Sequence, residues 1–192
     1  MLKGILFPFF GVIKMRIVAG KLRHRNFDMT NLETTRETQD RVREGIFNSI
    51  GPYFNGGISL DLFCGSASMS LEAYSRGIEY IYINDLNKRA LNCAINNCKK
   101  LGISSYKAYN LDYVDFLKQN KLQFDYIFVD PPYKDVDILK TLTLFKEYCT
   151  VKKGTLIVFE MDSNTENILV DGYTFIKERK YGKKKVLFYL YE

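Results

Sequence analysis

The sequence is poor in metal-binding side chains and in long apolar runs. It has four cysteines and one histidine, His24, among 192 residues. No two cysteines form a C-x-x-C pair, and structural zinc sites need clustered thiolates or imidazoles, so we expect no metal. Sparse, unpaired cysteines fit a reducing cytosol better than a disulfide scaffold. No apolar run reaches the roughly 18 residues that a membrane span requires. We therefore expect a cytoplasmic protein with no membrane partner.

The first fourteen residues, MLKGILFPFFGVIK, are apolar but are interrupted by Pro8 and Gly11. They lack the small-residue cleavage site of a signal peptide. Met15 then begins the more ordinary stretch MRIVAGK. We treat residues 1–14 as an N-terminal extension whose role the sequence does not define.

The remaining composition is that of a globular chain with an excess of basic residues. Hydrophobic residues make up 46% and charged residues 26% of the chain, which is ordinary for a folded domain. Lys and Arg number 28 against 22 for Asp and Glu, giving a net charge of +6. This excess is compatible with a polyanionic partner such as nucleic acid, although net charge alone is weak evidence.

From about Ser59 onward, short apolar runs alternate with segments of helical length. The predicted strands are ISLDLF, YIYIND, YKAYNLD, FDYIFVD and GTLIVFE, and helices are expected to begin near Ser66, Asn87, Asp112 and Asp135. This alternation predicts an α/β fold with a mostly parallel sheet covered on both faces. The last stretch, GYTFIKERKYGKKKVLFYLYE, predicts an antiparallel hairpin that turns at Gly182.

The preceding region differs in character. MRIVAGKLRHRNF predicts a basic strand or hairpin around Gly20, and TQDRVREGIFNSI predicts a helix opened by Thr38 or a neighbouring cap. We expect these two elements to form a small lobe attached to the sheet.

Acidic residues end three consecutive predicted strands. Asp61 closes the first, and Gly65 and Ser66 then make a tight turn into a helix whose N-terminus can face a ligand. Asp85 ends the second strand, where a carboxylate can accept hydrogen bonds from ribose hydroxyls. Asp112 follows the third and can bind an adenine amino group. Because ligands sit at the carboxyl ends of strands in such sheets, the pattern predicts an adenosine-containing cofactor.

The glycine pattern disfavours a dinucleotide. A G-x-G-x-x-G sequence would be expected for close approach to a pyrophosphate, and Ala67 and Ser70 stand where further glycines would be. We expect the Ala67 methyl group to face the cofactor.

The fourth predicted strand ends in FVDPPY. Two prolines cannot belong to a central strand, so they force a stiff exit from the sheet. The exocyclic amine of a base is a poor nucleophile, because its lone pair is delocalised into the ring. The Asp130 carboxylate and the Pro131 carbonyl can accept both amine hydrogens and free that lone pair, with Pro132 adding rigidity. Tyr133 can stack on a base swung out of its helix. The alternative is a proline turn with a solvated acid.

Three segments together carry a resemblance to a known family: DPPY after the fourth strand, LDLFCGSASMSLEAYSRG, and TQDRVREGIFNSI. They resemble the bacterial methyltransferases that methylate N2 of a guanine in 16S small-subunit ribosomal RNA. The similarity extends from Met15 to the C-terminus and includes GKLRHR and KYGKKKVLFYL. D-P-P-Y is shared with several amino-methyltransferases, whereas DRVREGIFN and LEAYSRG are more specific to this family.

The resemblance implies a Rossmann-like, seven-stranded sheet with an antiparallel last strand and a small N-terminal hairpin and helix lobe. It implies an RNA-binding hairpin and helix at 15–50 and a methyltransferase catalytic domain at 51–192. The cofactor would be S-adenosylmethionine, giving S-adenosylhomocysteine, without a metal. The residues that carry over to the cofactor are Asp61, Gly65, Ser66, Asp85, Asp112 and Thr38. Those that carry over to the target amine are Asp130, Pro131, Pro132 and Tyr133.

Some positions depart from the family pattern. The family usually has glycine at Ala67 and Ser70, glutamate at Asp85, and a Pro-Thr-Thr or Pro-Thr-Ser run where this chain has Glu37-Thr38-Gln39. None of these changes removes a group that the chemistry needs.

Basic side chains gather on the N-terminal hairpin and on the last turn, where phosphate contacts would position an RNA. The residues expected to bind RNA are Arg16, Lys21, Arg23, Arg25, Arg41, Lys183 and Lys184. Arg41 and Arg43 cannot share one helix face, so we expect one to face the pocket or target and the other solvent. The alternatives are ion pairing with Asp40 or Glu44 on the helix, and a solvated turn for the lysine run.

The expected partner is small-subunit ribosomal RNA, free or within an assembling or assembled 30S subunit, bound by a monomer. An adenine-N6 nucleic-acid methyltransferase shares the D-P-P-Y logic but normally carries a larger target-recognition region. A protein-glutamine methyltransferase usually has Asn at the position of Asp130. An RNA-binding protein with a relic cofactor fold is a third alternative, and the presence of Asp85, Asp112 and residues 130–133 argues against it.

Overall fold

The computed structural model describes residues 14–29, 36–131 and 136–192, with only the main chain of residues 36–39. The strands are β1 (Lys14–Arg16), β2 (Asn26–Asp28), β3 (Ile58–Asp61), β4 (Tyr80–Asn84), β5 (Tyr106–Tyr109), β6 (Phe124–Val129), β7 (Val151–Asp162), β8 (Tyr173–Tyr181) and β9 (Lys184–Tyr191). The helices are α1 (Arg36–Ile50), α2 (Ser68–Ser75), α3 (Lys88–Lys100), α4 (Tyr113–Gln119) and α5 (Ile138–Glu147).

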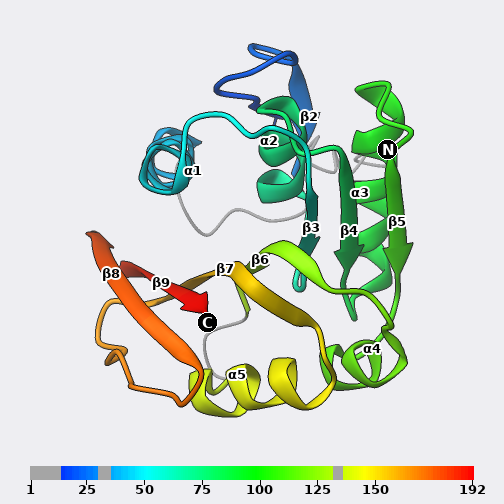
Figure 1. The fold of residues 1–192 in the computed structure, drawn as a ribbon. Helices are drawn as coiled ribbons and strands as arrows, with labels where there is room; N and C mark the ends of the chain where they lie inside the picture. Colours follow the sequence, from blue (N-terminus) through cyan, green and yellow to red (C-terminus); the bar gives the residue numbers. More distant parts are fainter. Residues whose placement is uncertain (1–13, 30–35, 132–135) are drawn as a thin grey trace, which may run out of the picture.

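The central sheet has seven strands in the order β5-β4-β3-β6-β7-β9-β8, and β1 and β2 form a separate antiparallel pair. The five strands from β5 to β7 are parallel, and β9 runs antiparallel to both of its neighbours. The predicted α/β sheet with an antiparallel last strand is therefore confirmed (Figure 1). The strand order reverses at β3, whose neighbours are β4 on one side and β6 on the other. The carboxyl ends of these three strands therefore lie side by side, where ligands bind in such sheets.

The helix boundaries follow from local capping. The Asn87 side chain accepts hydrogen bonds from the first turn of α3, and the Asp112 side chain does the same for α4, as expected from their positions. Helix α2 begins at Ser68, two residues after the expected start at Ser66. Helix α1 begins at Arg36, so Thr38 lies inside its first turn and is not its cap. The expected start at Asp135 lies outside the described residues.

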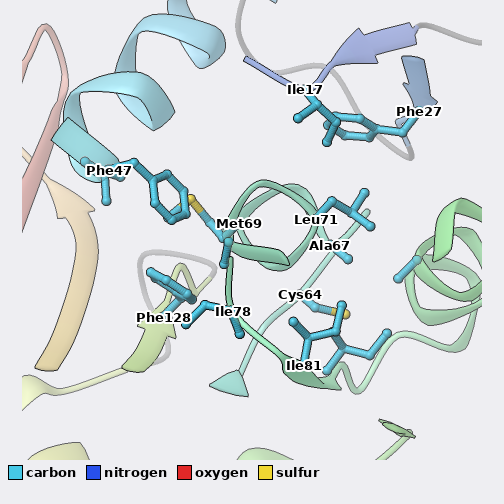
Figure 2. Packing of buried hydrophobic residues seen from close by; sticks show 14 of the residues in the cluster. Ile17, Phe27, Phe47, Cys64, Ala67, Met69, Leu71, Ile78, Ile81 and Phe128 are labelled. Atoms are coloured by element: carbon cyan, nitrogen blue, oxygen red, sulfur yellow. The ribbon is translucent and has the colours of Figure 1, made fainter. Parts of the chain in front are cut away.

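Two apolar cores lie on opposite faces of the sheet. Helices α1, α2 and α3 and the β1–β2 hairpin cover one face, and α4 and α5 cover the other. On the first face Phe47 of α1 packs against Phe128 of β6, with ring centroids 5.7 Å apart. Figure 2 shows Met69 of α2 beside both rings, and Ile17 and Phe27 of the hairpin region farther along the same core. The N-terminal segment thus shares its core with the sheet.

A buried carboxylate joins this segment to the rest of the chain. Glu72, on α2, has no exposed surface, and its oxygens accept hydrogen bonds from the main-chain N–H groups of Val18 and Ala19. They also pair with Arg43 of α1 at 3.3 Å and with Arg76 at 2.8 Å. Both arginine side chains are at most 3% exposed. One carboxylate therefore binds the hairpin, α1 and α2 together.

The network continues to the edge of the molecule. Arg43 also pairs with Asp40 at 2.8 Å and donates to the Arg16 carbonyl oxygen. Arg16 pairs with Asp40 in turn. Arg41 is exposed. The expected split between Arg41 and Arg43 is therefore found in part: Arg41 faces solvent, whereas Arg43 is buried in ion pairs with Asp40 and Glu72.

Close main-chain approaches fix the hairpin and α1 in place. Gly20 has φ of +82°, and a Cβ there would collide with the carbonyl oxygen of Ser75 at the end of α2. A Cβ at Gly45 of α1 would collide with the hydroxyl of Tyr181 at the end of β8. Larger residues at these two glycines would separate packed elements. Within the described ranges, no helix is both long and apolar enough to cross a membrane.

We predict that Glu72→Ala lowers the free energy of unfolding by about 3–5 kcal/mol, because it leaves two buried guanidinium groups without their carboxylate. Chemical denaturation of the two proteins measures this difference. Asp171→Asn is the matched control, since it breaks a carboxylate–lysine pair whose carboxylate is 98% exposed, and such pairs contribute at most about 1 kcal/mol. Equal losses in the two variants would show that the buried network contributes no more than a surface pair.

Candidate functional site

The turn after β3 is held by the acid at the end of β4. Gly65 has φ of +54°, and its N–H donates to Asp85 Oδ2 at 2.8 Å. The other oxygen, Oδ1, accepts from the N–H of Asn87 at the start of α3. Asp85 thus joins the turn to the next helix, and each of its oxygens keeps a lone pair for a further hydrogen bond. A Cβ at Gly65 would meet nothing within 4 Å, so the main chain of this turn borders open space.

Asp61 lies beneath this turn rather than at its surface. It is 2% exposed, and its Oδ2 accepts hydrogen bonds from the N–H and the hydroxyl of Ser70. Burial raises the pKa of Asp61 to about 7, against the lowering effect of the Ser70 hydrogen bonds and with a smaller rise from the charge of Asp85. Serine at position 70 therefore supplies a hydroxyl that a glycine there would lack.

Ala67 does not face the cofactor side. Its side chain is fully buried in the core between the sheet and the helices (Figure 2), so the expectation that its methyl group faces the cofactor is wrong. Ala67 has φ of 66° and ψ of 29°, a left-handed conformation that glycine adopts without strain. Alanine at this position therefore carries backbone strain that glycine would not, and it buries a methyl group that glycine lacks.

Two asparagines that the sequence analysis did not single out shape the same edge of the sheet. Asn84, 1% exposed at the end of β4, donates to the carbonyl oxygens of Leu62 and Leu111. Asn110 donates to the carbonyl oxygens of Asp85 and Leu86. Asn84 directly precedes Asp85, and Asn110 stands two residues before Asp112, each at the end of a strand. That position was the signal that could have identified them.

Asp112 is half-buried, and its side chain accepts from the N–H of Val114 at 2.9 Å as the cap of α4. It follows β5, which pairs directly with β4. The structure thus brings Asp61, Gly65, Asp85 and Asp112 to the carboxyl ends of three adjacent strands. Their roles toward a cofactor stay predictions.

Asn97 of α3 joins the hairpin to the turn. Its amide donates to the carbonyl oxygens of Asp28 and Ser66, and its Oδ1 accepts from the Asp28 N–H. The Ser66 hydroxyl contacts the sulfur of Met29 at 3.2 Å. The end of β2 therefore lies directly beside the predicted cofactor turn. Thr38 belongs to α1, but its side chain lies outside the described part of the structure.

Asp130 directly follows β6 and is half-buried. It lines a partly open hollow, which we call the β6–β7 hollow, with the following six residues: Ile46, Met69, Phe128, Val129, Val158 and Glu160. Pro131 is buried. Pro132 and Tyr133 lie outside the described residues, so their predicted contact with a target base stays a prediction.

The basic residues of the hairpin are exposed but lie away from the turn at Gly65. The main chain of Lys21 bonds to the Ser75 carbonyl oxygen, and its ammonium group lies 3.6 Å from the centre of the Tyr74 ring. Both contacts are at the C-terminal end of α2, whereas Gly65 precedes its N-terminal end. Arg23 and Arg25 are exposed nearby, and Arg25 donates to the Lys100 carbonyl oxygen.

The lysines of the last turn differ from one another. Lys183 is exposed. Lys184 is half-buried and pairs with Glu160. Lys185 is 6% exposed, pairs with Glu178 at 3.5 Å and donates to the Thr165 carbonyl oxygen. The run of lysines is therefore not a uniform solvated turn. In the described parts of the chain, no three histidine, cysteine or acidic side chains cluster as a metal site would require.

A protein family described as conserved hypothetical protein 95 matches residues 15–190. The chain belongs to this family. One relative in sequence is the ribosomal RNA small subunit methyltransferase D of Haemophilus influenzae, 35% identical over 173 residues, which covers 88% of this chain and 90% of the relative. The resemblance inferred from DPPY, LEAYSRG and DRVREGIFN is thereby confirmed.

Solved structures with the same fold support the architecture of this protein. The Escherichia coli protein yhhF, described as a candidate methyltransferase, superposes with a TM-score of 0.81 at 26% identity, over 93% of this chain and 98% of that chain. SMU.776, solved in complex with SAH, has a TM-score of 0.62 at 15% identity, over 86% of this chain and 53% of that one. At that identity the second likeness concerns the fold alone.

We predict that Asp61→Asn stabilises the protein increasingly as pH rises. The folded pKa of Asp61, about 7, lies above the ordinary value of 3.8, so the wild type loses stability as pH rises from the unfolded to the folded pKa. Asparagine carries no such charge. The difference in free energy of unfolding between the variant and the wild type should therefore rise by about 2–3 kcal/mol between roughly pH 5 and pH 7. It should change little above about pH 8.

Urea denaturation over this pH range tests the prediction, and parallel curves for the two proteins would contradict it. Ser70→Ala provides a second check. Because the Ser70 hydrogen bonds lower the pKa of Asp61, their weakening should move the loss of stability to higher pH.

Proposed function

We propose that this protein transfers a methyl group from S-adenosylmethionine to the exocyclic N2 amine of a guanine in small-subunit ribosomal RNA. The observation that carries the proposal is the placement of Asp130 and Pro131 at the end of β6, beside a turn and two acids suited to an adenosine cofactor. The name of the Haemophilus influenzae relative, a ribosomal RNA small subunit methyltransferase, supports the RNA class. The guanine target rests on the resemblance of the sequence motifs.

The residues present fit an adenosine cofactor. The open space beside Gly65 lets a ligand approach the main chain of the turn. Asp85 and Asp112 have carboxylate oxygens that can still accept hydrogen bonds, the first toward ribose hydroxyls and the second toward an adenine amine. The SAH complex of SMU.776 supports the same choice through the shared fold. When bound, S-adenosylmethionine supplies a methyl group made electrophilic by its sulfonium.

The chain's own part in the reaction is to prepare the amine. Asp130 Oδ and the Pro131 carbonyl oxygen accept one amine hydrogen each and draw the N2 lone pair out of conjugation with the ring. The freed lone pair would accept the methyl group that S-adenosylmethionine supplies, and N2 would then give up one proton, for which the Asp130 carboxylate is the adjacent acceptor. The apolar side chains of the β6–β7 hollow exclude water from this hydrogen-bonding group.

The basic hairpin would act at a distance from the chemistry. Helix α2 has eight residues, so Lys21 and Arg23 lie roughly 12 Å along its axis from the turn at Gly65. Contacts there with RNA phosphates would position the substrate without touching the reacting base. Substrate binding and chemistry are thus expected to respond to different mutations.

The first prediction of the proposal concerns the product and Asp130. With tritiated S-adenosylmethionine, small subunits or naked small-subunit RNA from cells lacking the enzyme should yield N2-methylguanosine on nucleoside analysis. Asp130→Ala should lower the rate by roughly 100-fold or more, because the amine loses a positioned acceptor, while cofactor binding measured by thermal shift stays close to that of the wild type.

N6-methyladenosine as the product would retain the mechanism and overturn the guanine target. Absence of methyl transfer to either RNA form despite cofactor binding would point instead to a protein substrate or a binding role. Near-normal activity of Asp130→Ala with normal cofactor binding would contradict the role given to the carboxylate.

The second prediction concerns the hairpin. Charge reversal at Arg23 and Arg25, singly and together, should raise the KM for RNA and reduce the salt dependence of binding, by about one unit of log–log slope for each phosphate that the variant no longer binds. The rate at saturating RNA should change little. Lys140→Glu is the control, because Lys140 is exposed on α5, across the molecule from the hairpin in Figure 1. If Lys140→Glu changed the KM for RNA and the salt dependence of binding as much as the hairpin variants do, the effect would come from net charge and not from the hairpin.

A further inference from the structure

The β6–β7 hollow holds a second carboxylate beside Asp130. Strands β6 and β7 are parallel, with Phe128 opposite Val158 and Val129 opposite Phe159. The next residues along the two strands are Asp130 and Glu160. Phe128 and Val158 belong to the core that α1, α2 and α3 cover, and Asp130 and Glu160 stand two residues after them, so strand alternation places both side chains on that same face. Both residues line the same hollow.

Glu160 is largely withdrawn from water but is not left as an isolated charge. It is 8% exposed and shares the hollow with apolar side chains such as Ile46 and Met69. Its carboxylate pairs with the ammonium group of Lys184 at the start of β9. A carboxylate in such surroundings is costly without a partner, and the pair offers an acceptor and a donor side by side at the edge of the hollow.

The chemistry of guanine matches this arrangement. Along one edge of the base, the N2 amine and N1–H are neighbouring donors, and O6 beyond them is an acceptor. Adenine presents its exocyclic amine next to N1, which is an acceptor without a hydrogen. A carboxylate next to the amine-binding group can therefore accept a hydrogen bond from guanine N1–H. It disfavours the binding of adenine, because the N1 lone pair of adenine would face a negative oxygen. Polar groups left unpaired in this way give strong discrimination between substrates.

We propose that Glu160 and Lys184 select the target base, with the Glu160 carboxylate accepting the N1–H of guanine and the Lys184 ammonium donating to O6. This inference rests on the proposed function and deepens it, because Asp130 is taken to hold the N2 amine of the same base. Glu160 is then a specificity-determining residue, and the amine chemistry stays with Asp130 and Pro131.

The test uses small-subunit RNA ligated from segments, in which the guanine that the enzyme methylates is either retained or replaced by 2-aminopurine. 2-Aminopurine keeps the N2 amine but lacks N1–H and O6. The wild type should prefer guanine by about ten- to a hundredfold in kcat/KM. Glu160→Gln should lower kcat/KM for guanine by about tenfold or more and change that for 2-aminopurine by less than about threefold, so that the preference collapses.

Glu178→Gln is the matched control. Glu178 of β8 pairs with Lys185 on β9, so this variant breaks another carboxylate–lysine pair of β9, and Glu178 does not line the β6–β7 hollow. It should keep the wild-type preference. Lys184→Gln replaces the ammonium donor to O6 by a shorter, neutral amide and also removes the charge that pairs with Glu160. It should narrow the preference in the same direction, which keeps the test decisive if Glu160→Gln does not fold.

An unchanged preference in both Glu160→Gln and Lys184→Gln, or an equal loss with the two bases, would overturn the inference and leave the pair a purely structural one. In that case the wild type still methylates guanine and the proposed function stands. Absence of guanine methylation by the wild type would overturn the proposed function, and this inference with it.

Discussion

The buried carboxylate of Glu72 is the interaction on which the arrangement of the N-terminal third depends. A charge without exposed surface is tolerated because two guanidinium groups and two main-chain N–H groups surround it. These partners come from the hairpin, from α1 and from the end of α2. Apolar packing is not directional, whereas this network specifies where the hairpin and α1 lie relative to α2.

The relative positions of the hairpin, α1 and α2 bear on the proposed function. Helix α2 begins at the predicted cofactor turn and ends at the basic hairpin, and α1 contributes Ile46 to the β6–β7 hollow. A rigid joint between these elements relates the surface proposed to hold RNA to the hollow lined by Asp130 and Glu160, two residues proposed to bind the target base. Asn97 makes a second joint nearer the turn, through Asp28 and Ser66. The chemistry then takes place between parts whose separation is fixed by buried polar groups.

The sequence predicted features that depend on neighbours in the chain. The mostly parallel α/β sheet with its C-terminal hairpin, the helix starts at Asn87 and Asp112, and the acids at the strand ends all follow from local patterns, and the structure has them. The roles of Arg43 and Lys184 did not follow, because their partners Glu72 and Glu160 lie 29 and 24 residues away. Ala67 was misjudged because its left-handed backbone turns the side chain into the core. No local pattern encodes these choices.

The long reach of the hairpin's contacts also bears on how the chain is made. The segment around Val18 and Asp28 is synthesised before its hydrogen-bonding partners Glu72 and Asn97, which follow 54 and 69 residues later. At typical synthesis rates that delay lasts roughly 3–14 s. Ile17 and Phe27, both fully buried in the finished protein, have no native core to enter during this time. The apolar side chains of the nascent N-terminal segment therefore stay exposed to solvent until α2 and α3 have been made.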